Sequence, residues 1–121
     1  MTIIDKNKAS TSEAIQTFIK QADFVLPKGF LDFFEEANGA YITSDEGYIT
    51  LWSLVDMIQL NKEYEVTESA PNFFIFGTDG GGEAFAIKKD TGGIYQIPFI
   101  GMSEEYAMFI CNDFFAFVSR F

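Results

Sequence analysis

The most constraining feature of the sequence is the segment 73–87, in which two apolar runs flank a glycine-rich turn. Four large apolar residues in succession, Phe73–Phe76, predict a strand that is buried on both faces. The segment Thr78–Gly82 has a common hairpin-loop length, and its glycines supply the positive φ angles that such a loop needs. Because an alternating run follows the loop, we interpret 73–87 as the central hairpin of an antiparallel sheet.

The composition indicates one folded domain with an aromatic-rich core. Of 121 residues, 48% are hydrophobic and 15 are phenylalanine, which excludes intrinsic disorder. The formal net charge is −10, and a surface of that sign repels phosphate backbones and anionic lipid headgroups. The charge therefore argues against nucleic acid and membrane as partners and permits a basic protein.

The chain has a single cysteine, Cys111, and no histidine. An intrachain disulfide is therefore excluded, and the residues that zinc requires are missing. The N-terminal residues lack the pattern of a signal peptide, and no apolar stretch approaches the roughly 18 residues of a membrane span. We expect a cytoplasmic protein.

Local patterns predict the element order α-α-β-β-α-β-β-β-α. Helices are expected to begin near the capping signals Ser10, Ser53 and Asn112 and at Pro27, and strands are expected over 40–43, 48–52, 73–77, 83–87 and 94–99. Residues 1–9 are polar and are expected to be loosely held, with the domain over residues 10–121. The fold class is a single α+β domain, in which about four helices cover a mostly antiparallel sheet of about five to six strands.

The order and spacing of these signals resemble the SUKH superfamily, which contains the Smi/Knr-type domains. The resemblance covers roughly residues 12–121 and rests on a proline that opens a helix, an asparagine-glycine pair that ends it, a glycine-rich central motif and an aromatic-rich C-terminal segment, 112–118. The matching residues, interpreted as determinants of the fold, are Pro27, Asn38, Gly39, Gly77, Asp79, Gly80 and Gly82.

The resemblance implies a domain without enzymatic activity. In bacteria, such domains are commonly immunity proteins, or antitoxins, that neutralise a cognate toxin by stoichiometric binding, and a nuclease is one candidate toxin. The alternative implied by eukaryotic members is a regulatory or scaffolding module that recruits host proteins. No cofactor, metal or small-molecule substrate is expected.

The central loop has two other possible interpretations, a phosphate-binding loop and a catalytic carboxylate pair. A phosphate-binding loop needs a following helix, or a lysine followed by serine or threonine, whereas a strand follows Gly82. Asp79 and Glu83 flank the loop, and a carboxylate pair could perform acid–base catalysis. The simpler interpretation is that Asp79 hydrogen-bonds its own turn and that Glu83 is solvated.

The remaining candidate for function is an anionic surface that mimics a phosphate backbone toward a basic toxin. Charge of this kind accelerates association and sets specificity. The residues proposed to contact the partner are Asp45, Glu46, Glu65, Glu68, Asp79 and Glu83. Aromatic residues dominate binding hot spots, so Tyr41, Tyr48 and Trp52 are candidate anchors if they are exposed.

Overall fold

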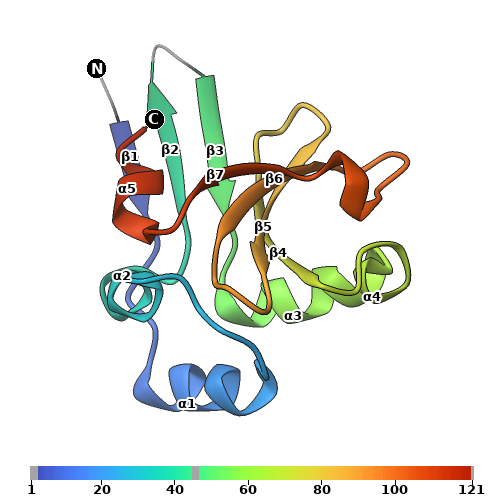
Figure 1. The fold of residues 1–121 in the computed structure, drawn as a ribbon. Coiled ribbons are helices and arrows are strands. Elements are labelled where there is room, and N and C mark those ends of the chain that lie inside the picture. The colour runs from blue at the N-terminus through green and yellow to red at the C-terminus, as the bar shows by residue number, and fades with distance from the viewer. Residues whose placement is uncertain (1–2, 45–46, 121) are drawn as a thin grey trace.

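The structure is a computed structural model that describes residues 3–44 and 47–120. Figure 1 shows a curled sheet with α1, α2 and α3 gathered at one end of it. The elements in chain order are β1 (Ile3–Lys6), α1 (Ser12–Gln21), α2 (Phe30–Glu36), β2 (Ala40–Ser44), β3 (Gly47–Leu51), α3 (Leu54–Glu63), α4 (Val66–Ser69), β4 (Phe73–Thr78), β5 (Glu83–Lys88), β6 (Ile94–Pro98), the 3-10 turn η1 (Glu104–Tyr106), β7 (Met108–Cys111) and α5 (Phe114–Val118).

The sheet is an antiparallel meander. Within the described residues it has seven strands, and each strand pairs with the next one along the chain from β1 to β7. The predicted central hairpin is β4–β5, with Phe74 opposite Ile87 and a register shift between Ile75 and Gly77. The predicted α+β class is confirmed, and the sheet is larger than predicted because β1 and β7 extend its two edges.

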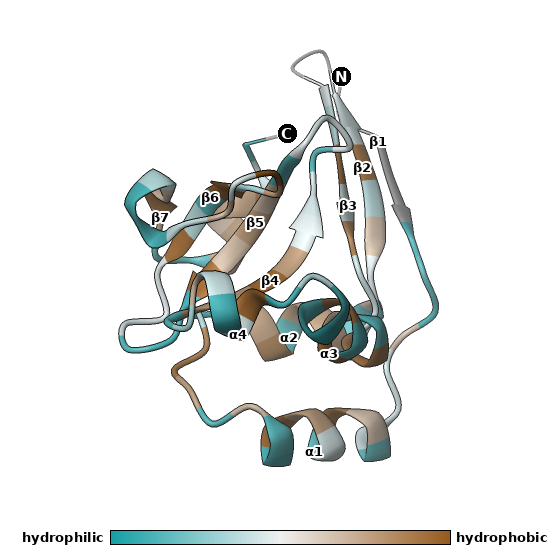
Figure 2. Cartoon of the chain, turned by 90° about the vertical axis from the view of Figure 1, so that its right-hand side faces the viewer, coloured by the Kyte–Doolittle hydropathy of each residue, from teal (hydrophilic) through white to brown (hydrophobic). Residues whose placement is uncertain are grey.

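The two faces of β4 belong to two hydrophobic clusters. Phe74 and Phe76 join the larger cluster, to which α1, α2, α3 and α5 contribute. Phe73 and Ile75 join a smaller cluster with Val66 of α4 and with residues of β5 and β6. All four side chains are buried, as the unbroken apolar run predicts. In Figure 2, β4 and β5 are mostly white to brown.

Three helices begin at side-chain caps, as the sequence predicts, but two of the capping residues differ. Ser53 caps α3, because its Oγ accepts a hydrogen bond from Asp56 N at 3.1 Å. The cap of α1 is Thr11 rather than Ser10, and its Oγ1 accepts from Ala14 N at 3.0 Å. The cap of α5 is Asp113 rather than Asn112, with Ala116 N donating to Oδ1 at 3.0 Å. Adjacent polar residues offer equivalent caps, so the sequence pattern places these helix starts to within one residue.

Pro27 precedes α2 instead of occupying its first turn. Helix α2 begins at Phe30, and its N-cap Gly29 has a φ of 84°. Residues 27–30 form a turn in which Phe30 N donates to Pro27 O at 3.1 Å. A Cβ at Gly29 would lie 2.6 Å from Cδ2 of Phe115. Glycine at this position thus admits both the Phe115 ring and the left-handed backbone.

Three regular segments lie outside the predicted elements. The sequence predicts a loosely held segment over residues 1–9, whereas Ile3–Lys6 form β1 and pair with β2. Asn7 N continues the contact by donating to Gly39 O at 3.0 Å. The connection between α3 and β4 contains the single-turn helix α4, and Met108–Cys111 form β7 on the far side of β6. Strand β6 ends at Pro98, one residue before the end of the predicted strand, and it is an inner strand of the sheet.

Candidate partner-binding surface

The loop between β4 and β5 is stabilised by hydrogen bonds from its own side chains. Asp79 Oδ1 accepts from Gly81 N at 2.7 Å and from Glu83 N at 3.2 Å. Thr78 Oγ1 donates to Glu83 O at 2.9 Å and accepts from Gly80 N at 3.0 Å. The Asp79 carboxylate is therefore an acceptor for its own turn, and this geometry fixes the path of the loop.

The glycines of the central motif have different roles. A Cβ on Gly77 would lie 2.5 Å from the Thr50 carbonyl oxygen, so glycine permits the close approach of β3 to β4. Gly80 has a φ of 77°, and a Cβ there would overlap the Tyr48 hydroxyl. Gly82 has a φ of 106° with open space around it, so glycine is favoured there by the backbone conformation and not by a close contact.

A hollow of about 640 Å³ lies beside this loop. We call it the loop hollow, and its lining residues come from β3, the 79–82 loop, β5, β6, β7 and the segment after α5: Gly47, Tyr48, Asp79, Phe85, Gln96, Ile110 and Arg120. Phe85 is buried, whereas Tyr48 and Arg120 are exposed. Gln96 Nε2 donates to Glu83 Oε1 at 3.1 Å, which holds the Glu83 carboxylate near the hollow. The site therefore has an apolar base and a polar rim with both signs of charge.

The structure separates the predicted acidic residues into two groups. Asp79 and Glu83 lie at the loop end of β4, whereas α4, with its N-cap Glu65 and with Glu68, lies at the other end of that strand (Figure 1). Six residues of strand span roughly 20 Å, so one small contact patch does not include both groups. Asp45 and Glu46 lie outside the described residues, and their neighbour in sequence, Gly47, lines the loop hollow.

Two of the predicted structural residues connect three segments of the fold. Asn38 Oδ1 accepts from Leu54 N at 2.9 Å, and Asn38 N donates to Lys8 O at 2.9 Å. Gly39 has a φ of 99°, and a Cβ there would lie 2.6 Å from the Leu51 carbonyl oxygen. The Asn38–Gly39 pair thus joins the end of α2 to the start of α3 and to the segment after β1.

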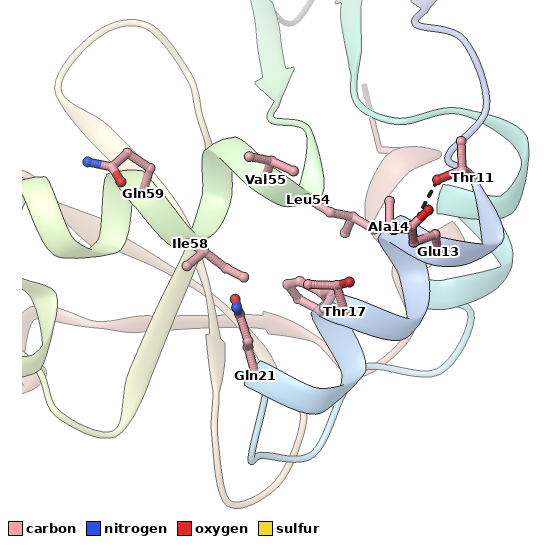
Figure 3. Close-up of a pocket in the computed structure, with 10 residues that line it drawn as sticks. Thr11, Glu13, Ala14, Thr17, Gln21, Leu54, Val55, Ile58 and Gln59 are labelled. Carbon is pink, nitrogen blue, oxygen red and sulfur yellow. Dashed lines mark hydrogen bonds between the residues drawn. The ribbon is translucent and has the colours of Figure 1, made fainter.

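A second concavity, the α1–α3 groove, lies on the helical side of the molecule. It has a volume of about 460 Å³. Figure 3 shows Thr17 and Gln21 of α1 facing Ile58 of α3 across the groove, with Leu54 closer to Ala14. Val55 on its rim is 68% exposed. The groove is mostly apolar, and Glu13 is the acidic residue that lines it, so it differs in character from the loop hollow.

Sequence reasoning missed an exposed apolar strand beside the loop hollow. In β7, Met108 and Phe109 are both more than half exposed, and Ile110 of the same strand lines the hollow. Of the proposed aromatic anchors, Tyr41 and Tyr48 are exposed and Trp52 is half-buried. A run of four apolar residues next to a helix cap, Met108–Cys111, is the signal that could have indicated this strand.

Among the described residues, no group of three or more cysteine, aspartate or glutamate side chains is arranged to hold a metal ion. Within the same residues, no helix has the length and apolar character needed to cross a membrane. The carboxylates of Asp79 and Glu83 are both hydrogen-bonded to neighbouring protein groups. The Asp79 and Glu83 carboxylates thus stabilise the loop and its contact with β6.

Comparison with known proteins gives a match over nearly the whole chain. The model of the SMI1 / KNR4 family (SUKH-1) matches residues 9–120. The matched range includes the 79–82 loop, the loop hollow and every helix that the structure describes. No curated protein matches the chain.

Proposed function

Because this chain belongs to the SMI1 / KNR4 family (SUKH-1), we propose that it is a bacterial immunity protein that acts in the cytoplasm. It binds a cognate protein toxin stoichiometrically and blocks the toxin's active site, without catalysis of its own. The observation that carries this proposal is the family match over residues 9–120. A toxin that acts on nucleic acid, such as a nuclease, is the favoured target because its substrate-binding surface is positively charged.

Charge supports the choice of a basic partner. The formal net charge of −10 creates a field that attracts a positively charged protein and accelerates encounter. We place the contact at the loop end of the sheet, where Asp79 and Glu83 lie beside the loop hollow and Tyr48 is exposed. Asp45 and Glu46 are assigned to the same contact because Gly47 lines the hollow. Glu65 and Glu68 contribute to the long-range field from the other end of β4.

The test is co-expression with the product of the adjacent gene. We expect the wild-type protein to protect the host cell from that product, and the purified pair to form a stoichiometric complex in which the toxin is inactive. Absence of both protection and a complex would refute the immunity function. A complex formed with host proteins instead would support a scaffolding role.

A further inference from the structure

Strand β7 is an open edge of the sheet. It pairs with β6 through Tyr95–Phe109 and Gln96–Met108, and within the described residues no strand pairs with its outer side. The backbone N–H and C=O groups on the outer side of an edge strand form a template for another strand. This edge adjoins the loop hollow, because Ile110 of β7 lines it.

The side chains of this edge are large and apolar. Met108 is 60% exposed and Phe109 is 55% exposed. The Phe109 ring packs edge-on against Tyr95 at 5.4 Å between centroids, which holds it on the sheet surface. Such exposure of methionine and phenylalanine on a strand has a solvation cost, and covering both side chains would recover it.

Strand β7 lacks two common protections against strand pairing. Edge strands are usually blocked by lysine, by proline, by bulges or by short length. Strand β7 contains neither charge nor proline, and the chain has no lysine or arginine between Asp90 and Ser119. The register irregularity in the β6–β7 pair is an extra residue on β7, Ile110, because Cys111 lies opposite Ile94 and Phe109 lies opposite Tyr95. Met108 and Phe109 precede this bulge and pair in regular register.

Both ends of β7 are held in place. Before it, the Glu104 carboxylate accepts from Asn72 N at 2.8 Å and from Asn72 Nδ2 at 3.1 Å. After it, Phe114 N donates to Lys28 O at 2.8 Å. A strand that is already fixed in extended form loses little conformational entropy when a partner adds to it.

The charges around this edge select the occupant. Glu104 and Glu105 precede β7, and Asp113 follows it. A second copy of this chain would bring the same acidic residues against these, in addition to the net charge of −10 that each copy carries. A positively charged segment meets attraction at both ends of the strand instead.

We propose that β7 receives an extended, positively charged segment of the partner protein as an added strand. Main-chain hydrogen bonds supply affinity in this mode. Because Met108 and Phe109 are consecutive in β7 and point to opposite faces of the sheet, alternate apolar side chains of the segment cover one of them and the aliphatic stems of its basic side chains cover the other. Lysine or arginine side chains of the segment face Glu105 and Asp113. This inference rests on the proposed function for the identity of the partner, which is the toxin.

The test compares Met108→Lys and Phe109→Lys with the control Val55→Lys, at an exposed apolar residue on the rim of the α1–α3 groove. Circular dichroism establishes that each variant is folded, and Phe109→Thr, which retains strand propensity, replaces any variant that is not. With the adjacent gene's product as the probe, we expect the β7 variants to bind at least tenfold more weakly than the wild type. We expect Val55→Lys to bind with the affinity of the wild type. Hydrogen exchange of amides 108–111 should slow in the wild-type complex.

The outcomes separate this inference from the immunity function. If the wild type binds the product, the β7 variants bind it with unchanged affinity and amides 108–111 are not protected, the strand addition is overturned. The immunity function is left intact by that result. If the wild type binds no such product, a nine-residue peptide of alternating valine and lysine becomes the probe, with a valine–glutamate peptide as its control. Protection of amides 108–111 by the lysine peptide alone supports the open edge, and no protection overturns it. A wild-type dimer that Phe109→Lys dissociates would assign the edge to a second copy and overturn the proposal.

Discussion

The Asn61 side chain pairs with the backbone of Ile75 as a neighbouring strand would. Its Oδ1 accepts from Ile75 N at 2.9 Å, and its Nδ2 donates to Ile75 O at 2.8 Å and to Met57 O at 2.7 Å. Strand β3 pairs with β4 at Thr50–Thr78 and Leu51–Gly77, and Trp52 N donates to Phe76 O at 3.1 Å before the chain turns into α3. The asparagine on α3 therefore satisfies the part of β4 that β3 does not reach.

Replacement of Asn61 by leucine should destabilise the protein by about 1–3 kcal/mol, because the polar backbone groups of the buried residue Ile75 lose their partner. Urea unfolding measures the change. The matched control is Gln59→Leu on the same helix, where the exposed amide donates only to Glu63 Oε1. We expect the control to change the free energy of unfolding by less than about 0.5 kcal/mol. Equal losses for the two variants would contradict the role assigned to Asn61.

Gly77→Ala should destabilise the protein, whereas Gly81→Ala should change its stability little. A Cβ at Gly77 meets the Thr50 carbonyl oxygen at 2.5 Å, so β3 and β4 must separate locally. We expect Gly77→Ala to lower the free energy of unfolding by about 1–3 kcal/mol. At Gly81 the nearest atom is Asp79 Oδ1 at 3.6 Å, and its φ is not in the left-handed region. The expected change there is under about 1 kcal/mol, of either sign. Thermal unfolding of the two single variants provides the comparison.

The sequence predicts those parts of the fold that have strong local signals. The run Phe73–Phe76 predicts a strand covered on both faces, and Ser53 predicts the start of α3, both of which the structure has. The family resemblance is confirmed by the match over residues 9–120. The strand and the helix start depend on residue patterns that extend over only a few positions.

The features that were missed depend on contacts between distant residues. Strand β1 is short and polar at its end, and its pairing with β2 joins segments nearly forty positions apart. Helix α4 is a single turn that follows Glu65, whose φ of 53° no sequence pattern indicates for a glutamate. Asn61 lies among polar residues of α3, and its role depends on Ile75 fourteen positions later.

For the candidate site, the sequence supplied residue types but not their arrangement. It predicted acidic contact residues, and the structure places Asp79 and Glu83 together and Glu65 and Glu68 elsewhere. The separation depends on the direction of β4, which composition does not encode. The exposed edge β7 follows from the strand order of the sheet, which is a property of the whole chain.

Adjacent phenylalanines in α5 should differ in their contribution to stability. Phe114 is fully buried and packs against Phe30 at 5.1 Å and Phe33 at 5.2 Å between ring centroids. Phe114→Ala should cost about 3–5 kcal/mol, because it leaves a cavity between α2 and α5. Phe115 is 42% exposed, so Phe115→Ala should cost less than half as much. Chemical denaturation of both variants measures the difference, and similar losses would show that the packing of α5 is not as described.

The charges at the loop end should act on the rate of association with the toxin rather than on folding. In the double variant Asp79→Asn and Glu83→Gln, each amide oxygen retains the acceptor that the loop and Gln96 use. The free energy of unfolding should therefore change by less than about 1 kcal/mol. The association rate constant should fall roughly two- to tenfold at low salt, and the difference should shrink as salt rises because screening removes the attraction.

The matched control for this charge change is the double variant Glu13→Gln and Asp56→Asn, on the helical side of the molecule. It removes the same two negative charges, so it lowers the long-range field by the same amount of net charge. Stopped-flow measurement of association with the adjacent gene's product compares the two double variants. A larger effect at Asp79 and Glu83 places the contact at the loop end, because attraction is strongest between charges that come within a Debye length of about 10 Å at 0.1 M salt. Equal effects would mean that net charge alone steers the toxin and that the loop hollow is not where it binds.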